Sequence, residues 1–402
     1  MKKNFLKAIQ TLFIFSLAFT LTSCWNFDNP LEDLEGSGSG GGGGSTTVKV
    51  TSITLDKTSL PIHVGDADVT LTATVEPDDA TDKAVTWSSD KTAVATVDEA
   101  GKVHAVAIGT AIITATAKDG SGIKATCNVS VLPAGALAGI FSVSATKTVW
   151  FSQGNLQYQA SPSKWRFAEN QYDYVGDNTV GNVYVETTKS DNASISSSYT
   201  GWIDLFGWGT SGYDHGATCY QPYSTSTTSP QYYAYGDKSK TLYDDTGKAD
   251  WGYNIISNGG NEENFGWRTL TKDEWVYLFN RTVNGGTGEH YSYTLNQEIF
   301  GKVKGIVLYP DNYKGAEFTG GPSSVWATFE AAGCVFLPFA GRRTSGTSVA
   351  QASTDGHYWS STPGGTYDTE AYQVSYASGT LKTDGHIERS NGLSVRLVYN
   401  AQ

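Results

Sequence analysis

The chain has 402 residues, which is too long for one average domain and favours two or three folded units with tails. The formal net charge is -12, so phosphate backbones and anionic lipid head groups would repel the protein as a whole, and we expect no nucleic-acid partner. Short alternating apolar runs outnumber long helical patterns, and the chain holds 23 Tyr and 11 Trp. The expected fold class is therefore mostly β.

Residues 1–24 have the layout of a secretory signal. Three lysines within the first seven residues precede an apolar run over residues 12–21, and the sequence LTSC closes it. The apolar run is too short to span a membrane as a mature helix. LTSC resembles the lipobox of bacterial lipoproteins, which implies that Cys24 becomes the lipidated first residue after cleavage. An ordinary secretory peptide with an unrelated cysteine is the alternative.

Residues 25–47 read as a tether. Its acidic residues Asp28, Glu32, Asp33 and Glu35 resemble the tract with which Bacteroides-type bacteria direct lipoproteins to the outer face of the outer membrane, although a solvated spacer is the alternative. The stretch GSGSGGGGGSTT at 36–47 cannot bury a core and is typical of a flexible coil. The expected location is the outer membrane, at the cell surface, with attachment to the membrane through the lipid alone.

Residues 48–133 show strand periodicity. In VTLTATV, apolar residues 69, 71, 73 and 75 share one face, and in IKATCNVSV residues 123, 125, 127, 129 and 131 do the same. Turn signals such as EPDDATDK and KDGSG separate the runs, so we expect a small antiparallel sandwich. The succession VTWSSD, VATVD and GKVHAVAIGTAIITATA resembles the bacterial immunoglobulin-like group 2 (BIG2) domain. The resemblance implies a spacer or adhesion module.

Residues 135–402 have a different texture, rich in aromatic residues and glycine. FSVSATKTVWFSQGNLQYQ predicts a pair of strands, and TKDEWVYLFNR predicts a helix. Thr271 can cap the first turn of this helix, with Glu274 three residues on as a capping box requires. Trp275, Leu278 and Phe279 share one face and should pack against a sheet.

The sequence carries little sign of catalysis. Its six histidines form no H-E-x-x-H motif, and neither a G-x-S-x-G elbow nor a P-loop is present. The local hint of a nucleophile and base is His357 beside Ser360 and Ser361, but neighbours in a turn or strand rarely point together without further support. We expect the protein not to be an enzyme.

Cysteines and carboxylates leave some alternatives open. Cys127 reads as a buried free thiol on an apolar strand face. Cys219 and Cys334 could form a disulfide, because exported proteins meet an oxidising compartment. Carboxylates such as those in YDDTGKAD at 243–250 lack EF-hand spacing, so a solvated turn is the default there. We expect no cofactor, with calcium left open.

The C-terminal part also carries motifs of a known family. They are Trp267-Arg268, Leu270-Thr271 and Glu274-Trp275, then YWSST at 358–362, then SVRLV at 394–398. They resemble the Fibrobacter succinogenes major paralogous domain and its relatives, which implies an α+β C-type lectin-like fold following the Ig-like β-sandwich. The sequence has RTLT where that family often has RLPT. YWSST is then framework, in which Trp359 packs in the core and the serines satisfy backbone groups.

The same fold also houses formylglycine-generating oxidases. Their chemistry requires a reactive cysteine pair near the C-terminal core, and this chain has no cysteine after Cys334. An oxidase of this type is therefore the least favoured function.

The segment 363–391 lies between the framework motifs and has the composition of recognition loops. The predicted ligand-binding residues are Tyr367, Asp368, Tyr372, Tyr376 and Asn391. The resemblance also leaves open that retroelements diversify this segment, because such elements rewrite codons for Tyr, Asn and Asp.

The sequence thus predicts a lipid-anchored surface protein for binding or adhesion. Its C-terminal domain would recognise a glycan or a protein of the host or cell surface. The alternative is a structural or assembly subunit of a surface appendage.

Overall fold

The structure is a computed structural model that describes residues 47–159, 164–174, 202–212, 241–243, 248–284, 289–290, 292–299, 303–343, 349–377 and 379–401. The predicted signal peptide, Cys24 and the tether up to residue 46 lie outside these residues. Within the described ranges, no helix is both long and apolar enough to cross a membrane.

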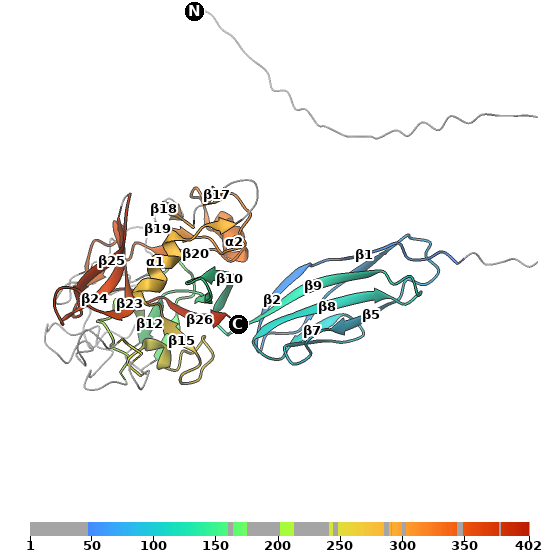
Figure 1. The fold of residues 1–402 in the computed structure, drawn as a ribbon, viewed down its shortest axis with the longest axis horizontal. Helices are drawn as coiled ribbons and strands as arrows, with labels where there is room; N and C mark the ends of the chain where they lie inside the picture. The colour runs from blue at the N-terminus through green and yellow to red at the C-terminus, as the bar shows by residue number, and fades with distance from the viewer. Residues whose placement is uncertain are drawn as a thin grey trace, which may run out of the picture. The chain divides into compact units, whose positions relative to one another are not determined.

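Nine strands, β1 to β9, make up the described chain before residue 133 (Figure 1). Their bounds are β1 Ser52–Leu55, β2 Ser59–His63, β3 Val69–Thr70, β4 Ala73–Glu76, β5 Val85–Ser89, β6 Ala95–Val97, β7 Lys102–Ala105, β8 Gly109–Ala117 and β9 Lys124–Leu132. They form sheets in the orders β2-β9-β8-β5, β3-β7-β6 and β1-β4. The mostly β fold expected from the sequence is confirmed.

The predicted alternation in this part is confirmed. On β9 the side chains of Cys127, Val129 and Val131 are buried while Asn128 between them is exposed. One detail differs, because β2 pairs with β9 in parallel, with Leu60 beside Val129. The two strands lie far apart in sequence, so no hairpin forces them to run antiparallel. The expectation of a wholly antiparallel sandwich is wrong at this pair.

Aliphatic side chains fill the interior of this part. One cluster gathers Leu60, Ile62, Val103, Ile113 and residues of β9, and a second lies around Val50, Ile53 and Val75. Cys127 belongs to the first cluster as a fully buried free thiol, as the sequence predicts.

The chain after residue 135 builds shorter and more varied elements (Figure 1). The strands are β10 Ala136–Ser142, β11 Thr148–Ser152, β12 Leu156–Gln159, β13 Lys164–Phe167, β14 Trp202–Ile203, β15 Trp267–Thr269, β16 Val283–Asn284, β17 Glu289–His290, β18 Tyr293–Ile299, β19 Val303–Leu308, β20 Val335–Pro338, β21 Arg342–Arg343, β22 Val349–Ala350, β23 Asp355–Pro363, β24 Glu370–Ala377, β25 Thr380–Glu388 and β26 Leu397–Ala401. The helices are η2 Trp251–Tyr253, α1 Lys272–Asn280 and α2 Ser323–Ala331. The larger sheets run β10-β11-β26-β15, β13-β12-β14, β18-β19-β20 and β23-β24-β25, and β16-β17 and β21-β22 are two-stranded.

Helix α1 forms as the sequence predicts. The Thr271 hydroxyl accepts the backbone N–H of Glu274, and the Glu274 carboxylate accepts the backbone N–H of Thr271, which completes the capping box. Glu274 also forms a bidentate ion pair with Arg268 at 2.6 and 2.8 Å. Trp275, Leu278 and Phe279 are buried on one face, so the predicted docking stripe is confirmed.

Helix α2 is absent from the sequence prediction. Pro322 occupies its N-cap position and makes no side-chain cap, and Trp326 is its one buried residue. A helix without a capping signal and without a wide apolar stripe leaves little pattern to find.

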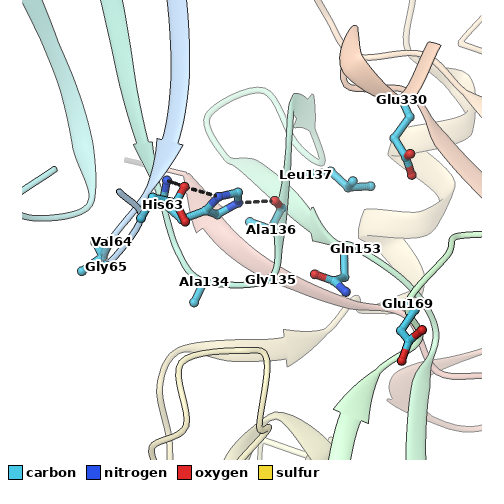
Figure 2. A pocket seen from close by; sticks show the side chains of 11 residues that line it. His63, Val64, Gly65, Ala134, Gly135, Ala136, Leu137, Gln153, Glu169 and Glu330 are labelled. Carbon is cyan, nitrogen blue, oxygen red and sulfur yellow. Dashed lines mark hydrogen bonds and ion pairs between the residues drawn. The ribbon is translucent and has the colours of Figure 1, made fainter. Parts of the chain in front are cut away.

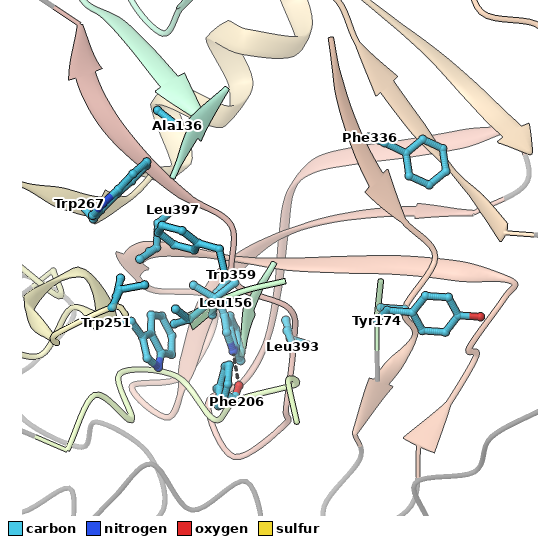
Figure 3. Packing of buried hydrophobic residues seen from close by; sticks show 14 of the residues in the cluster. Ala136, Leu156, Tyr174, Phe206, Trp251, Trp267, Phe336, Trp359, Leu393 and Leu397 are labelled. Atoms are coloured by element: carbon cyan, nitrogen blue, oxygen red, sulfur yellow. Dashed lines mark hydrogen bonds between the residues drawn. The ribbon is translucent and has the colours of Figure 1, made fainter. Parts of the chain in front are cut away.

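The interior of the C-terminal part is dominated by aromatic rings. Figure 3 shows Trp251, Trp267, Trp359 and Phe206 in the larger cluster, with a hydrogen bond of 2.7 Å from the Trp359 indole N–H to the carbonyl of Phe206. Trp359 is fully buried, which confirms its predicted place in the core. Because buried indole N–H groups need acceptors, such bonds fix the ring orientations as well as satisfying polarity.

The three framework motifs converge in this interior. Strand β26 lies between β11 and β15, so Arg268 pairs with Val398, while the backbone N–H of Trp359 donates to the carbonyl of Ser394 at 3.1 Å. Arg396 is buried and donates to Gln171 Oε1 at 2.9 Å. Burial lowers the pKa of Arg396 to about 10, so the guanidinium stays charged at neutral pH. The motif residues therefore act as scaffold.

Candidate ligand-binding surface

Strands β23, β24 and β25 form one antiparallel sheet (Figure 1). Its two faces carry different side chains. Tyr358, Val374 and Tyr376 belong to the same buried cluster as Trp275 and Leu278 of α1. The opposite face keeps polar side chains, and the edge strand β25 alternates exposed and half-buried residues along its length. The helix thus holds the sheet rigid from one side while the other side stays available.

The turn between β23 and β24 is organised around Glu370. Its carboxylate accepts the backbone N–H groups of Thr366 at 2.6 Å and Tyr367 at 3.0 Å, and lies 3.2 Å from His386 Nδ1. Partial burial acts to raise the pKa of Glu370, but the two backbone hydrogen bonds and His386 outweigh it and lower the pKa. Gly365 sits in this turn with φ +124°, a conformation that favours glycine.

Tyr367 is presented at the tip of this turn. Its side chain is 63% exposed, the highest value among the large exposed apolar and aromatic residues described. A large aromatic ring on a backbone that is fixed by Glu370 loses little further entropy on binding. Asp368 follows it and is also exposed.

Tyr372, at the start of β24, extends the aromatic surface. Its half-buried ring lies beneath Lys272 Nζ, 4.8 Å from the ring centroid, and meets His386 edge-on at 6.3 Å. Asn391 follows the end of β25 and donates from Nδ2 to the carbonyl of Glu388, which itself pairs with Glu370. The sheet therefore brings Tyr367, Asp368, Tyr372 and Asn391 to the same end.

The prediction that Tyr376 is a ligand-binding residue is wrong. Its ring is 1% exposed, stacks on Tyr358 at 6.0 Å, and its hydroxyl donates to the carbonyl of Leu337 at 3.1 Å. Because Tyr376 lies on the face of β24 that packs against α1, its ring is a core side chain and cannot be the exposed ligand contact that was expected.

The polar face of the sheet carries a groove with a volume of about 430 Å³. It is lined by residues of β21 to β25 and the segments between them: Arg342, Gln351, Asp355, His357, Gln373, Ser375, Tyr376, Ala377, Thr380, Lys382, Gly385 and His386. The volume lies within the range of small-molecule sites in proteins. His386 lines the groove and also contacts Tyr372, so the groove adjoins the aromatic surface.

His357 lines this groove on β23. The side chain is 6% exposed, and its Nδ1 lies 3.0 Å from Gln373 Oε1. Burial lowers the pKa of His357, and the nearby Arg342 acts in the same direction, so the imidazole is neutral at pH 7. With Nδ1 donating to Gln373, Nε2 is an acceptor, and it has no hydrogen-bond partner in the described part of the chain.

The catalytic alternative for His357 gains no support. Ser360 Oγ donates to the carbonyl of Tyr372 at 3.0 Å, which is the backbone role expected of it. Ser361 Oγ is buried without a partner among the described residues, so the same expectation is wrong for Ser361. His357 hydrogen-bonds to Gln373 rather than to either serine.

Other predicted sites are partly outside the described residues. Cys219 is among the residues not described, and Cys334 is a buried free thiol. No group of three metal-ligating side chains occurs in the ranges that the structure describes. The expectation of a solvated turn is wrong at Asp250. This residue is 1% exposed and accepts the backbone N–H groups of Gly252 at 2.8 Å and Thr269 at 3.0 Å.

A second cavity, of about 490 Å³, is lined by residues 63–66 at the end of β2, residues 134–137 around the start of β10, and Gln153, Glu169 and Glu330. Figure 2 shows the His63 ring among them, with Nε2 2.9 Å from the Ala136 carbonyl and Nδ1 3.2 Å from Asp66. Both ring nitrogens are thus satisfied within the protein, and this cavity presents no unpartnered imidazole.

Sequence reasoning did not find the groove residues Arg342, Gln373 and Lys382. They come from three separate strands, and none stands in a motif. The alternation TLKTDGHIE was the one available signal, since it is typical of an exposed strand. The extra residue of the register shift in β25 leaves Lys382 beside Ser375 and His386 beside Tyr372, so the alternation of faces does not run unbroken between them.

Comparison with known proteins identifies one region. Residues 43–129 match the model of the bacterial Ig-like domain (group 2). An uncharacterized protein of Clostridium acetobutylicum is 48% identical over 84 residues, which are 21% of this chain and 9% of that protein. An alpha-L-arabinofuranosidase of Bifidobacterium longum subsp. longum is 45% identical over 123 residues, 31% of this chain and 11% of the enzyme. A lacto-N-biosidase of Bifidobacterium bifidum is 53% identical over 60 residues, 15% of this chain and 5% of the enzyme.

Among solved structures, domains 5-6 of the S-layer protein SbsC match with 22% identity and a TM-score of 0.19, over 26% of this chain and 62% of that one. The chain spans about a tenth or less of the three curated relatives described above. The segment 43–129 of this chain is a bacterial Ig-like domain of group 2, as its sequence pattern predicts.

Proposed function

We propose that the chain is a lipid-anchored protein of the cell surface that binds a glycan or a protein through its C-terminal part, on a C-type lectin-like scaffold. The observation that carries the proposal is the exposed Tyr367 on a turn whose backbone is held by Glu370. Binding residues are commonly displayed in this way, on loops positioned by a rigid scaffold.

The neighbourhood of Tyr367 suits recognition of polar ligands. Tyr372 offers a half-buried ring, and Lys272, His386 and Glu370 surround it with charged and hydrogen-bonding groups. Sugar rings and peptide side chains both combine apolar faces with polar edges, and aromatic rings beside polar groups match that combination. Binding without catalysis is part of the proposal.

The Ig-like domain supports a spacer role in this arrangement. Similar segments occur in proteins named as an alpha-L-arabinofuranosidase and a lacto-N-biosidase, both of which are named for sugars. We propose that the domain carries the binding part away from the lipid at Cys24. Loss of membrane association in Cys24→Ser, together with protease shaving of intact cells, tests the anchor and the exposure.

Binding is tested by screening the purified protein on glycan and host-protein arrays. We expect Tyr367→Ala and Tyr372→Ala each to weaken binding by about tenfold, as for central aromatic contacts. The control is Tyr277→Ala, which removes a 37% exposed tyrosine on α1 and should leave binding unchanged.

Unaltered binding by both tyrosine variants would show that the surface is wrongly chosen. If no ligand binds and the protein instead co-purifies with other outer-membrane subunits, the assembly role replaces the binding role.

A further inference from the structure

The groove on the outer face of β23–β25 gathers cations that the protein does not neutralise. Arg342 and Lys382 both line it, and neither makes an ion pair in the described part of the chain. The described carboxylate in the lining is Asp355. Two unpaired cations against one carboxylate make this groove basic in a chain of net charge -12. A local positive site of this kind attracts anions.

The sheet register sets the spacing of these groups. A bridge between Gly341 and Gly356 places Arg342 next to His357. His357 pairs with Ser375, which pairs with Lys382, so the three lie in one row across the sheet. Two strand spacings separate His357 from Lys382, about 10 Å between backbones. Arg342 and Lys382 therefore stand at opposite sides of a hydroxyl and an imidazole.

The groove also offers acceptors. His357 Nε2 is a buried acceptor without a partner in the described residues, and Asp355 supplies a carboxylate at the rim. A buried polar atom left unpaired is destabilising, and a ligand donor in reach would remove that cost. A ligand that fits must therefore carry hydroxyl or N–H donors as well as negative charge.

We propose that this groove binds a sugar acid, namely a monosaccharide unit that bears a carboxylate, within a larger glycan. The carboxylate would pair with Arg342 or Lys382, and ring hydroxyls would meet His357, Ser375 and Asp355. The inference rests on the proposed function in that it takes the C-terminal part to be the ligand-binding part. The adjoining rings of Tyr372 and Tyr367 would contact the next sugar units.

The lining favours a sugar over an acidic peptide. Ala377 is the one aliphatic side chain among the twelve lining residues, and Tyr376, the one tyrosine among them, is only 1% exposed. A peptide that binds by apolar anchor side chains needs apolar pockets, which these lining residues do not form, whereas a ligand covered with hydroxyls matches the polar lining that is present.

The test is an array of glycans that contain uronic or sialic acid units, each beside its carboxyl-reduced counterpart, with poly-glutamate as the acidic peptide. The full protein should bind at least one acidic glycan about tenfold more tightly than its reduced form. Titration calorimetry with that glycan should show about tenfold weaker binding for Arg342→Gln and for Lys382→Ala. Binding should also weaken as salt rises.

Lys314→Ala is the matched control, since it removes one exposed lysine of the same part outside the groove and should change nothing. Lys382 is exposed on the edge strand, so Lys382→Ala should fold even if Arg342→Gln does not. Equal binding of acidic and reduced glycans, unaltered binding by Lys382→Ala, or binding of poly-glutamate alone would each overturn the inference. Neutral ligands that bind through Tyr367 would overturn it while leaving the proposed function intact, and failure of every ligand would overturn both.

Discussion

The interiors of the two parts of the described chain are built from different kinds of side chain. The Ig-like domain fills its clusters with aliphatic side chains on regular strands, and its one tryptophan, Trp87, is partly buried. The described C-terminal part encloses six tryptophans completely, together with Arg389 and Arg396, among short strands. Its polar groups therefore need specific partners, as Trp359 finds in Phe206. A regular interior tolerates small changes, whereas an interior of large rings and buried charges depends on each position.

Among the substitutions that test this contrast, Trp359→Ala should cause the largest loss of stability. It removes a fully buried indole and leaves the Phe206 carbonyl without its donor, so we expect the C-terminal part to lose about 3–5 kcal/mol of stability. Urea denaturation followed by circular dichroism measures the loss. Trp359→Phe should lose less because it keeps an aromatic ring. Equal losses for the two variants would show that ring packing contributes little.

Asp250 should make the stability of the C-terminal part depend on pH. Burial raises its pKa to about 6 despite hydrogen bonds from Gly252 and Thr269, whereas an unfolded Asp titrates near 4. The folded state binds the proton more tightly, so this contribution is fully present below about pH 4 and is lost as the pH rises through about 6. A shift of about two units corresponds to about 3 kcal/mol.

The measurement is the free energy of unfolding from pH 4 to pH 7 for the protein and for Asp250→Asn, which cannot ionise. Relative to Asp250→Asn, the unsubstituted protein should lose up to about 3 kcal/mol of unfolding free energy as the pH rises from 4 to 7. A constant difference would mean that folding leaves the pKa of Asp250 unshifted.

Substitution of Cys127 tests the aliphatic interior of the Ig-like domain and should cause the smallest loss of stability. Cys127→Ala removes one small buried side chain from the Ig-like domain, so we expect a loss of about 1 kcal/mol. Burial raises the pKa of the Cys127 thiol, so a thiol reagent should modify it after unfolding and not before. A loss as large as that of Trp359→Ala would remove the distinction between the two interiors.

Much of the fold follows from local pattern. Period-two alternation predicted the buried face of β9 with Cys127, and the capping box predicted α1 with its stripe at Trp275. The YWSST motif predicted the core position of Trp359. Each of these features depends on neighbours within a few residues, which a single sequence displays.

The binding surface was predicted in part. Tyr367 and Asp368 are exposed in the turn, but loop composition alone could not separate Tyr372 from Tyr376, which lie on the same strand. The register shift between Gln373 and Ser375 adds its extra residue to β25, so β24 keeps its alternation and the two tyrosines share a face. Their different environments follow from where α1 packs, because Tyr376 lies among the buried residues of the helix whereas Tyr372 lies beside Lys272 at its start. That placement is not encoded in the segment itself.

The sequence by itself determined the Ig-like domain, the mostly β class, the capped helix and the framework role of Trp359, because strand period, capping and motif are local properties. The tertiary structure alone decided that Tyr376 is buried, that Asp250 is enclosed, and that Arg342, His357 and Lys382 share one groove. The physical reason is that these features depend on which strands become neighbours. Strand neighbours far apart in the chain are chosen by the burial of the whole interior rather than by any short stretch.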